Sequence, residues 1–166
     1  FCEICRVQRS VIQINDDVLV KKLTRVALGI NRPKDLTSAI AGSFLTIVED
    51  NFDAQGRPGW AGLSPVTEAR RKAGKILSQS GQLRDSIQPD SNDTEASISS
   101  SDPKVPTHQF GAKQGQYGKS SRGGPLPWGD IPARPFMPMD ENGNLQSEAE
   151  SAIYDDVDYF YQKLFD

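Results

Sequence analysis

Apolar residues recur every three or four positions in three stretches of the chain, which is the spacing that places side chains on one face of an α-helix. The predicted helices cover residues 17–29, with Asp16 or Asp17 as the N-cap, residues 35–52 and residues 145–164. Their apolar stripes are, in order, Leu19, Leu23, Val26, Ala27 and Ile30; Leu36, Ile40, Phe44, Ile47, Val48 and Phe52; and Leu145, Ala149, Ile153, Val157, Phe160 and Leu164. These stripes predict Phe44, Phe52 and Phe160 as core anchors.

Three shorter stretches have the composition and alternation of β-strands. They cover residues 9–14, 83–88 and 94–99. Residues 89–93, between the last two, contain a proline, two aspartates and an asparagine, which is the chemistry of a tight turn. The pattern therefore predicts a short N-terminal strand and, later in the chain, a β-hairpin.

A turn-rich loop over residues 53–63 surrounds Trp60 with glycines and a proline. A tryptophan in such a loop usually folds back onto the core, so Trp60 is predicted as a core anchor; the alternative is an interface anchor. Ser64 and Pro65 follow, with the chemistry of an N-cap and a first helical position. They predict a helix that continues to about Leu77.

Periodicity vanishes over residues 101–130, where glycines are frequent. A segment of this length without apolar residues to bury is typically either functional or disordered. We predict an arm that is mobile in the free subunit and becomes ordered against a neighbour.

The sequence Ile-Pro-Ala-Arg-Pro-Phe at residues 131–136 contains two prolines three positions apart. Each proline fixes φ and removes a backbone donor, so this segment must be a stiff, extended element. Such an element presents its side chains at fixed places, either to the core or to a partner. We expect Phe136 to be buried and Arg134 to pair with a carboxylate, either within the subunit or in the next one. Both residues are also interface candidates.

The order of these elements predicts an α+β fold, in which helices pack against a small antiparallel sheet. The 166 residues suit one domain over residues 9–166, preceded by an extension at residues 1–8. Apolar residues make up 36% of the chain, so much of it is expected to lie outside a compact core. Neither a run of about 18 apolar residues nor an apolar leader is present. We therefore expect a cytosolic protein or a component of a particle assembled there.

Charge is divided unevenly along the chain. Residues 1–83 carry a net charge of +4 and residues 84–166 a net charge of −7. The basic groups are densest at Arg70, Arg71, Lys72 and Lys75, and the acidic groups are densest in the terminal helix, which includes Asp155 and Asp156. One interpretation is two solvated helix faces; the other is head-to-tail attraction between subunits, which makes these six residues interface candidates.

Candidate catalytic and metal-binding residues are few. Cys2 and Cys5 form a CxxC pair, but His108 is the only histidine and lies far along the chain, so a four-ligand zinc site is not predicted. His108 also lacks a neighbouring nucleophile motif and reads as a structural residue. The segment Gly118-Lys119-Ser120 lacks the preceding glycine of a phosphate-binding loop. We therefore expect no enzymatic activity and no cofactor.

The basic cluster offers an alternative function in nucleic-acid binding. No aromatic residues interleave with it, and the calculated pI of 5.2 argues against sequence-specific recognition. Under this alternative the cluster makes non-specific contacts with phosphate groups, for instance where the protein lines a channel through which DNA passes.

Several segments in order resemble one family, the phage virion-morphogenesis proteins of Mu-like phages. The matching pieces are Phe52, Gly56-Arg57-Pro58-Gly59-Trp60, Leu63, Thr67, Lys75-Ile76-Leu77, Ser80-Gly81-Gln82-Leu83-Arg84-Asp85-Ser86-Ile87, His108-Gln109-Phe110-Gly111 and Ile131-Pro132-Ala133-Arg134-Pro135-Phe136. The family pattern has a fuller β-strand before the His108 piece, where this chain has Pro103 and Pro106.

The resemblance implies a non-enzymatic structural protein of the virion, assembled in the host cytoplasm and placed at the head–tail junction. Proteins of this kind resemble tail terminators or tail-completion factors, which cap the tail tube as a ring. The implied partners are further copies of the chain, with six-fold symmetry expected, the tail tube or sheath protein, and the head connector or neck proteins. The alternative within virion assembly is a capsid assembly accessory protein.

Overall fold

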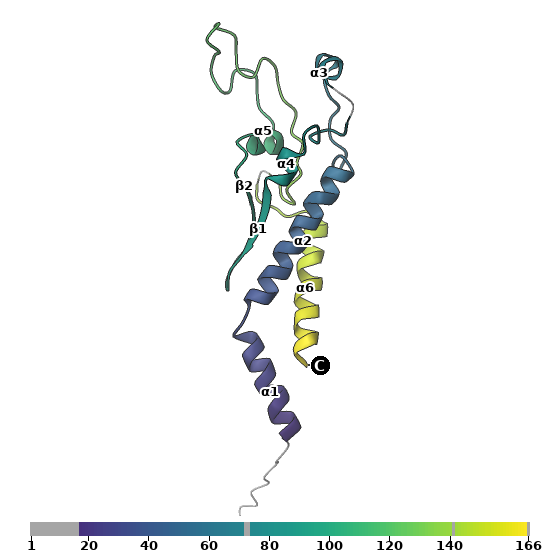
Figure 1. The fold of residues 1–166 in the computed structure, drawn as a ribbon, viewed down its shortest axis with the longest axis vertical. Helices are drawn as coiled ribbons and strands as arrows, with labels where there is room; N and C mark the ends of the chain where they lie inside the picture. The colour runs from purple at the N-terminus through teal and green to yellow at the C-terminus, as the bar shows by residue number, and fades with distance from the viewer. Residues whose placement is uncertain (1–16, 72–73, 141, 166) are drawn as a thin grey trace, which may run out of the picture.

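The computed structural model describes residues 17–71, 74–140 and 142–165 (Figure 1). The strand predicted over residues 9–14, the CxxC pair and Lys72 lie outside these ranges. The described part confirms the α+β expectation, because it combines helices with one two-stranded antiparallel sheet. The molecule is elongated, with the long helices at one end and loops at the other.

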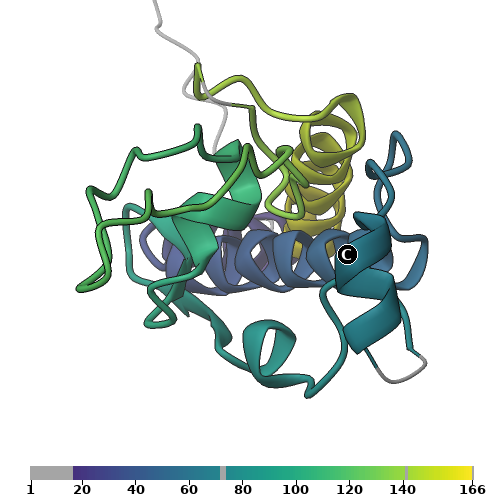
Figure 2. The same cartoon turned by 90° about the horizontal axis from the view of Figure 1, so that it is seen from above.

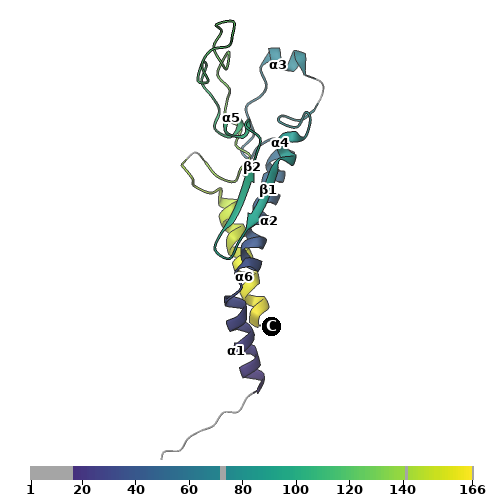
Figure 3. The same cartoon turned by 60° about the vertical axis from the view of Figure 1, so that its left-hand side comes forward.

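Three long helices confirm the three periodic stretches: α1 (Asp17–Ile30), α2 (Lys34–Asp53) and α6 (Ser147–Phe165). Helices α2 and α6 lie side by side and run in opposite directions, and α1 continues beyond the start of α2 to contact α6 (Figures 1 and 3). Gly29 allows this second contact, because a Cβ at that position would overlap the side chain of Leu164. The two contacts tie the C-terminal helix to the N-terminal half of the chain.

Helix α2 is the central element, since α6 and both strands pack against it (Figure 2). The C-terminal part of its apolar stripe, Ile47, Val48 and Phe52, is buried, whereas Phe44 nearer the start is half-buried. Asn51 is fully buried as well, although it is polar. The core therefore lies around the C-terminal half of α2.

The predicted hairpin is confirmed, but its boundaries are different. Strand β1 (Ile87–Ser91) pairs with β2 (Ala96–Ser100), so Pro89 and Asp90, which were assigned to the turn, belong to a strand. Both strands of a two-stranded sheet are edges, where the missing donor of a proline is tolerated. The residues before β1 form a short helix, α4 (Gln82–Asp85), because Gly81 turns the chain with a φ of 77°.

Helix α3 (Pro65–Arg70) begins where it was predicted and ends early. The Ser64 side chain accepts a hydrogen bond from the backbone N–H of Thr67, as an N-cap does. The continuation to Leu77 is wrong: the backbone of Arg71 is extended, and Leu77 has a positive φ of 61°, which no helix accommodates.

The expectation of no regular structure over residues 101–130 is wrong for its first part, which forms α5 (Val105–Phe110). The Asp102 carboxylate accepts a hydrogen bond from the backbone N–H of Lys104 in the turn that precedes this helix. The helix is too short to produce a periodic pattern. Beyond α5 the chain forms a loop that projects from the molecule (Figure 1). Ala112 pairs with Ile131 at its base. The predicted mobility of this loop stays a prediction.

Aromatic rings form the centre of the core. The Phe52 and Phe136 rings lie 5.0 Å apart between centroids, and the Trp60 ring meets Phe52 edge-on at 5.8 Å. Pairs in these arrangements contribute about 0.5–1.5 kcal/mol beyond the area that they bury. The buried members of the cluster are Val48, Phe52, Leu83, Ile87, Phe136 and Met137.

Candidate functional site

The segment over residues 131–139 is held by the buried side chain of Gln109, at the end of α5. The Gln109 Oε1 atom accepts hydrogen bonds from the backbone N–H groups of Phe136, at 3.0 Å, and Met137, at 2.9 Å. Its Nε2 group donates to the carbonyl oxygen of Met139 at 2.9 Å. A proline-rich segment cannot make the backbone hydrogen bonds of a sheet at every position. The side-chain amide of Gln109 therefore bonds to backbone groups of this segment in place of a neighbouring strand.

Two residues on the other side complete this clamp. Asn51 Nδ2 donates to the carbonyl oxygen of Phe136 at 3.0 Å, and Trp60 Nε1 donates to that of Pro135 at 2.8 Å. Gly111 lies against the segment so closely that a Cβ there would be 2.7 Å from one of its carbonyl oxygens. The separate sequence pieces around Trp60, Gln109 and Phe136 therefore meet in one place, whose function is to hold the fold.

Arg134 and Phe136 both lie inside the subunit. The burial of Phe136 is confirmed, at 0% exposure. Within the subunit the expected carboxylate partner of Arg134 is wrong: its Nε and Nη2 groups donate to the carbonyl oxygens of Ala61 and Gly62, at 3.0 and 2.9 Å. A carboxylate from the next subunit stays a prediction. Burial lowers the pKa of the Arg134 guanidinium, and the two carbonyl oxygens accept from its Nε and Nη2 groups without bringing a second charge. The interface role of the two residues stays a prediction.

The predicted core anchors occupy different places. Phe52 is fully buried, and Trp60 is half-buried against the same cluster. Phe44 and Phe160 are half-buried. Phe160 borders a hollow between α1 and α6 together with Leu164, so it belongs to the contact between those helices.

The basic cluster is partly used within the subunit. Arg70 is exposed, whereas Arg71 donates from Nη2 to the carbonyl oxygen of Lys75. Lys75 in turn forms a salt bridge with Asp53 at 3.4 Å, and Arg84 binds the same carboxylate at 3.1 Å. Hydrogen bonds from Arg84 and then Lys75 lower the pKa of Asp53. Among the basic interface candidates in the described ranges, Arg71 and Lys75 make bonds within the subunit, whereas Arg70 faces solvent.

The acidic pair on α6 is also divided. Asp156 accepts a hydrogen bond from the Ser43 hydroxyl at 2.8 Å, which ties α6 to α2. Asp155 is exposed and has no side-chain hydrogen bond or salt bridge within the described ranges. The basic cluster follows α3, at the loop end of the molecule, and α6 extends towards the opposite end (Figure 1). The chain does not bring the two charged groups together within one subunit.

Large apolar side chains are exposed at both ends of the molecule. We define the helical end by exposed residues of α1 and α6: Val20, Leu23, Leu28, Ile30, Tyr154, Tyr159, Tyr161 and Phe165. We define the loop end by Phe110, Tyr117, Leu126 and Trp128, of which Trp128 is 76% exposed. Sequence periodicity assigned two of these residues, Leu23 and Ile30, to a buried stripe, and the structure exposes both. Periodicity missed the aromatic side chains of the projecting loop because that segment has no period.

The described ranges contain no group of three His, Cys, Asp or Glu side chains placed to hold a metal ion. His108 is half-buried on α5. Burial is the first cause that lowers the pKa of its imidazole, followed by the positive charge of Arg134. Nor does any described helix have the length and apolarity needed to cross a membrane.

Comparison with known proteins gives a direct match. The model of the phage virion morphogenesis family matches residues 14–159. The chain belongs to this family. It is also 30% identical, over 154 residues, to the Mu-like prophage FluMu G protein 2 of Haemophilus influenzae. The aligned region covers 92% of this chain and 96% of the Haemophilus influenzae protein. No solved structure matches. Membership of the virion morphogenesis family gives the protein a role in building a phage particle and confirms the resemblance seen in the sequence.

Two functional residues of the fold were missed by sequence reasoning. Asn51 interrupts the apolar stripe of α2 next to Phe52, and a polar residue at a core position is the signal that could have revealed it. Gln109 lies within the His-Gln-Phe-Gly piece of the virion morphogenesis pattern, but nothing local distinguishes it from an exposed glutamine.

Proposed function

We propose that the chain forms a closed, six-fold ring at the end of a phage tail tube, where it completes the tail and joins it to the head connector. The observation that supports this most strongly is the exposure of large apolar side chains at two different ends of one subunit. Monomeric soluble proteins rarely expose contiguous apolar patches larger than roughly a few hundred Å², so a gathering of large exposed apolar side chains supports an interaction site.

The two ends are unlike each other, which favours contacts of one surface with a different surface. The helical end combines aliphatic side chains with tyrosines, and the loop end carries Trp128 and Tyr117. Contacts between unlike surfaces generate rings when the rotation between neighbours closes, and open filaments when it does not. A ring is the form that caps a tube and stops its growth.

Charge adds a second attraction between neighbouring copies. The exposed Arg70 is the last residue of α3, at the loop end of the molecule, and the exposed Asp155 lies on α6. Partners of the completed ring are the tail tube or sheath protein on one face and the head connector or neck proteins on the other. In this role the protein acts through its surfaces and has no catalytic activity.

The experiment is a mass measurement followed by binding to purified tail tubes. Sedimentation velocity of the free protein, and electron microscopy of tubes after addition of the protein, should show a six-fold ring on the tube end. Arg70→Glu with Arg71→Glu should weaken assembly, and adding Asp155→Lys with Asp156→Lys should partly restore it. A protein that remains a monomer both in solution and in finished particles contradicts the proposal.

Salt separates the charged part of the contact from the apolar part. The Debye length falls from about 10 Å at 0.1 M salt to about 3 Å at 1 M, so attraction between exposed charges should weaken over that range. If assembly does not change with salt concentration, contacts between the apolar ends alone close the ring. Binding to duplex DNA by the isolated chain, lost with the same arginine substitutions, would instead support the nucleic-acid alternative.

A further inference from the structure

Strand β2 has an open edge. Its backbone groups make no hydrogen bond with any described residue outside the hairpin. Figures 1 and 3 place β2 on the outer side of the hairpin, with β1 nearer to α2. The edge of such a strand is a template to which a further strand can add.

The hydrogen bonds of the hairpin show which groups of β2 point outwards. The backbone N–H of Asn92 donates to the carbonyl oxygen of Glu95 at 2.9 Å, and bonded pairs recur at every second residue of an antiparallel ladder. By this alternation Pro89 and Ile98 form a pair without bonds between them. Pro89 agrees, because it has no N–H to donate. The backbone groups of Ile98 therefore point away from β1.

The same alternation gives free N–H and C=O groups to Ala96, Ile98 and Ser100. Natural edge strands are commonly protected by charged residues or by proline. The outer strand has the sequence Ala-Ser-Ile-Ser-Ser, which contains neither, whereas β1 contains Pro89 and Asp90. Of the two edges of this sheet, that of β2 is the one suited to accept a strand.

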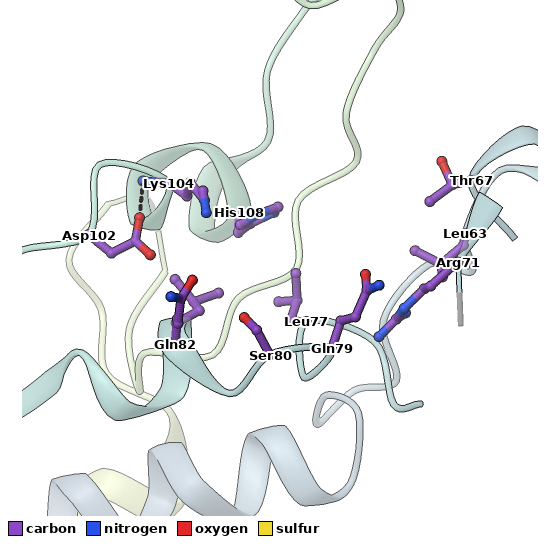
Figure 4. Close-up of a pocket in the computed structure, with 11 residues that line it drawn as sticks. Leu63, Thr67, Arg71, Leu77, Gln79, Ser80, Gln82, Asp102, Lys104 and His108 are labelled. Atoms are coloured by element: carbon purple, nitrogen blue, oxygen red, sulfur yellow. Dashed lines mark hydrogen bonds between the residues drawn. The ribbon is translucent and has the colours of Figure 1, made fainter. Parts of the chain in front are cut away.

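The edge ends where the chain turns into α5. The backbone N–H of Asp102 donates to the Ser100 hydroxyl at 3.1 Å, and the Asp102 carboxylate accepts from the backbone N–H of Lys104 at 2.9 Å. Figure 4 shows the second bond, at the border of a hollow between α3, α4 and α5. The free edge is therefore limited to the five residues of β2, and a segment of similar length would pair with all of it.

We propose that residues 9–14 of a second copy of the chain add to β2 as an antiparallel strand, an inference that rests on the proposed ring. These residues lie outside the described ranges, and their sequence, Arg-Ser-Val-Ile-Gln-Ile, predicts a strand. It is rich in β-branched residues, which favour strands, and it carries no proline. Antiparallel pairing is the commoner and slightly more stable arrangement.

The apolar side chains specify the register. Ile98 is half-buried and packs against the core cluster. Residues directly opposite each other on neighbouring strands share a face of the sheet, so pairing Ile12 with Ile98 places Ile12 and Ile14 on the core side. Gln13 and Val11 then lie on the solvent side. A shift by one residue would turn both isoleucines to solvent.

The same subunit cannot supply this strand. Thr37, in the first turn of α2, donates from Oγ1 to the carbonyl oxygen of Asn92 at 2.6 Å, so the turn of the hairpin lies beside the start of α2. From there α1 extends away from the hairpin for 14 residues, or about 21 Å (Figures 1 and 3). The chain from Asp17 back to Ile14 spans at most about 11 Å, and paired strands lie about 5 Å apart. A neighbouring copy has no such limit.

Hydrogen exchange resolved to single amides of the full chain tests the edge. In the dissociated subunit the amides of Ser97 and Ser99 should be protected, because they bond to β1, while those of Ala96, Ile98 and Ser100 exchange rapidly. On assembly the exchange of the latter three should slow at least about tenfold. Exchange of these three amides that is unchanged by assembly overturns the proposal.

A proline in the added strand tests the occupant. Ile12→Pro removes an N–H and should weaken association, measured by sedimentation velocity, at least about tenfold. Glu3→Pro makes the same kind of change outside the predicted strand and should leave association unchanged. Equal association of the two variants overturns the role of residues 9–14. If the three amides of β2 still become protected when Ile12→Pro assembles, β2 pairs with another strand, such as β2 of a second copy.

A disulfide tests the register and the copy that supplies the strand. In a chain with Cys2→Ser and Cys5→Ser, Gln13→Cys with Ser97→Cys places the two thiols on opposite residues, and the disulfide should join chains into covalent oligomers on a denaturing gel. Ser99→Cys in place of Ser97→Cys is the matched control and should cross-link less. Stronger cross-linking at Ser99 overturns the antiparallel register. A cross-linked species with the mass of one chain overturns exchange between copies.

The two proposals fail differently. If the wild type forms rings on tail tubes and Ile12→Pro does so equally well, the ring stands and the exchanged strand does not. If the Gln13–Ser97 cross-link joins copies that form dimers and never bind tail tubes, the exchanged strand stands and the ring does not. A wild type that neither self-associates nor binds tail tubes overturns both.

Discussion

The side-chain oxygen of Gln109 lies 3.0 Å from the backbone nitrogen of Phe136, a residue 27 positions later in the chain. This bond joins α5 to the extended segment and sets the depth at which the Phe136 ring enters the core. The same oxygen also accepts from Met137, so one amide determines the path of two consecutive residues.

Gln109→Leu should therefore lower the free energy of unfolding by about 2–5 kcal/mol, because two buried backbone donors lose their acceptor at about 1–3 kcal/mol each. Urea unfolding followed by circular dichroism measures the change. Gln162→Leu, on the exposed face of α6, is the matched control and should change stability by less than about 0.5 kcal/mol. Equal stabilities of the two variants would contradict the role of Gln109.

Trp60→Ala should cost about 3–5 kcal/mol, as large-to-small changes at core contacts do. It removes the edge-on contact with Phe52 and the hydrogen bond to the Pro135 carbonyl oxygen. Trp128→Ala makes the same substitution at an exposed site and should shift stability by about 0.5 kcal/mol or less. If Trp60→Ala melts like the wild type but fails to assemble, Trp60 is an interface anchor instead.

Hydrogen exchange should divide the segment over residues 101–130 into two parts. Amides of α5 should be protected, because that helix is joined to the core through Gln109. Amides of residues 113–130 should exchange rapidly in the free subunit, since ordering costs about 1–2 kcal/mol per residue and the exposed Trp128 and Tyr117 bury little in return. These amides should become protected on assembly. Strong protection of the whole loop in a monomer contradicts the prediction.

Asp53→Asn should remove part of the acid sensitivity of folding. Hydrogen bonds from Arg84 and Lys75 hold the pKa of Asp53 below its usual value of 3.8, so its contribution to stability is present above that value and is lost as the pH falls through the native pKa. Wild type and variant should differ most at neutral pH and converge at low pH, by a small amount because the carboxylate is exposed. Unfolding measured between about pH 7 and about pH 2 tests this. A difference that is constant with pH would argue against the ionic contribution.

Long periodic segments could be predicted because their signal is local. The apolar stripes of α1, α2 and α6 repeat over several turns, so helix type and length follow from spacing alone. Short elements could not be predicted as well. Helix α3 ends earlier than predicted, α5 was not predicted, and the turn of the hairpin lies closer to the C-terminus than predicted. Their limits depend on single backbone angles and on one or two capping bonds, which a short sequence window does not specify.

The sequence by itself determined the helical frame, the hairpin, the stiffness of residues 131–136 and the family, because each depends on residues close together or on an ordered set of short pieces. Only the tertiary structure decided which polar side chains hold the core and which charges remain exposed. Asn51, Gln109 and Arg134 became internal because the extended segment needs partners for its backbone groups. Lys75 and Asp156 became engaged because folding placed Asp53 and Ser43 beside them. Such pairings join residues that are distant in sequence, and a local pattern of residues does not indicate which distant residues will come into contact.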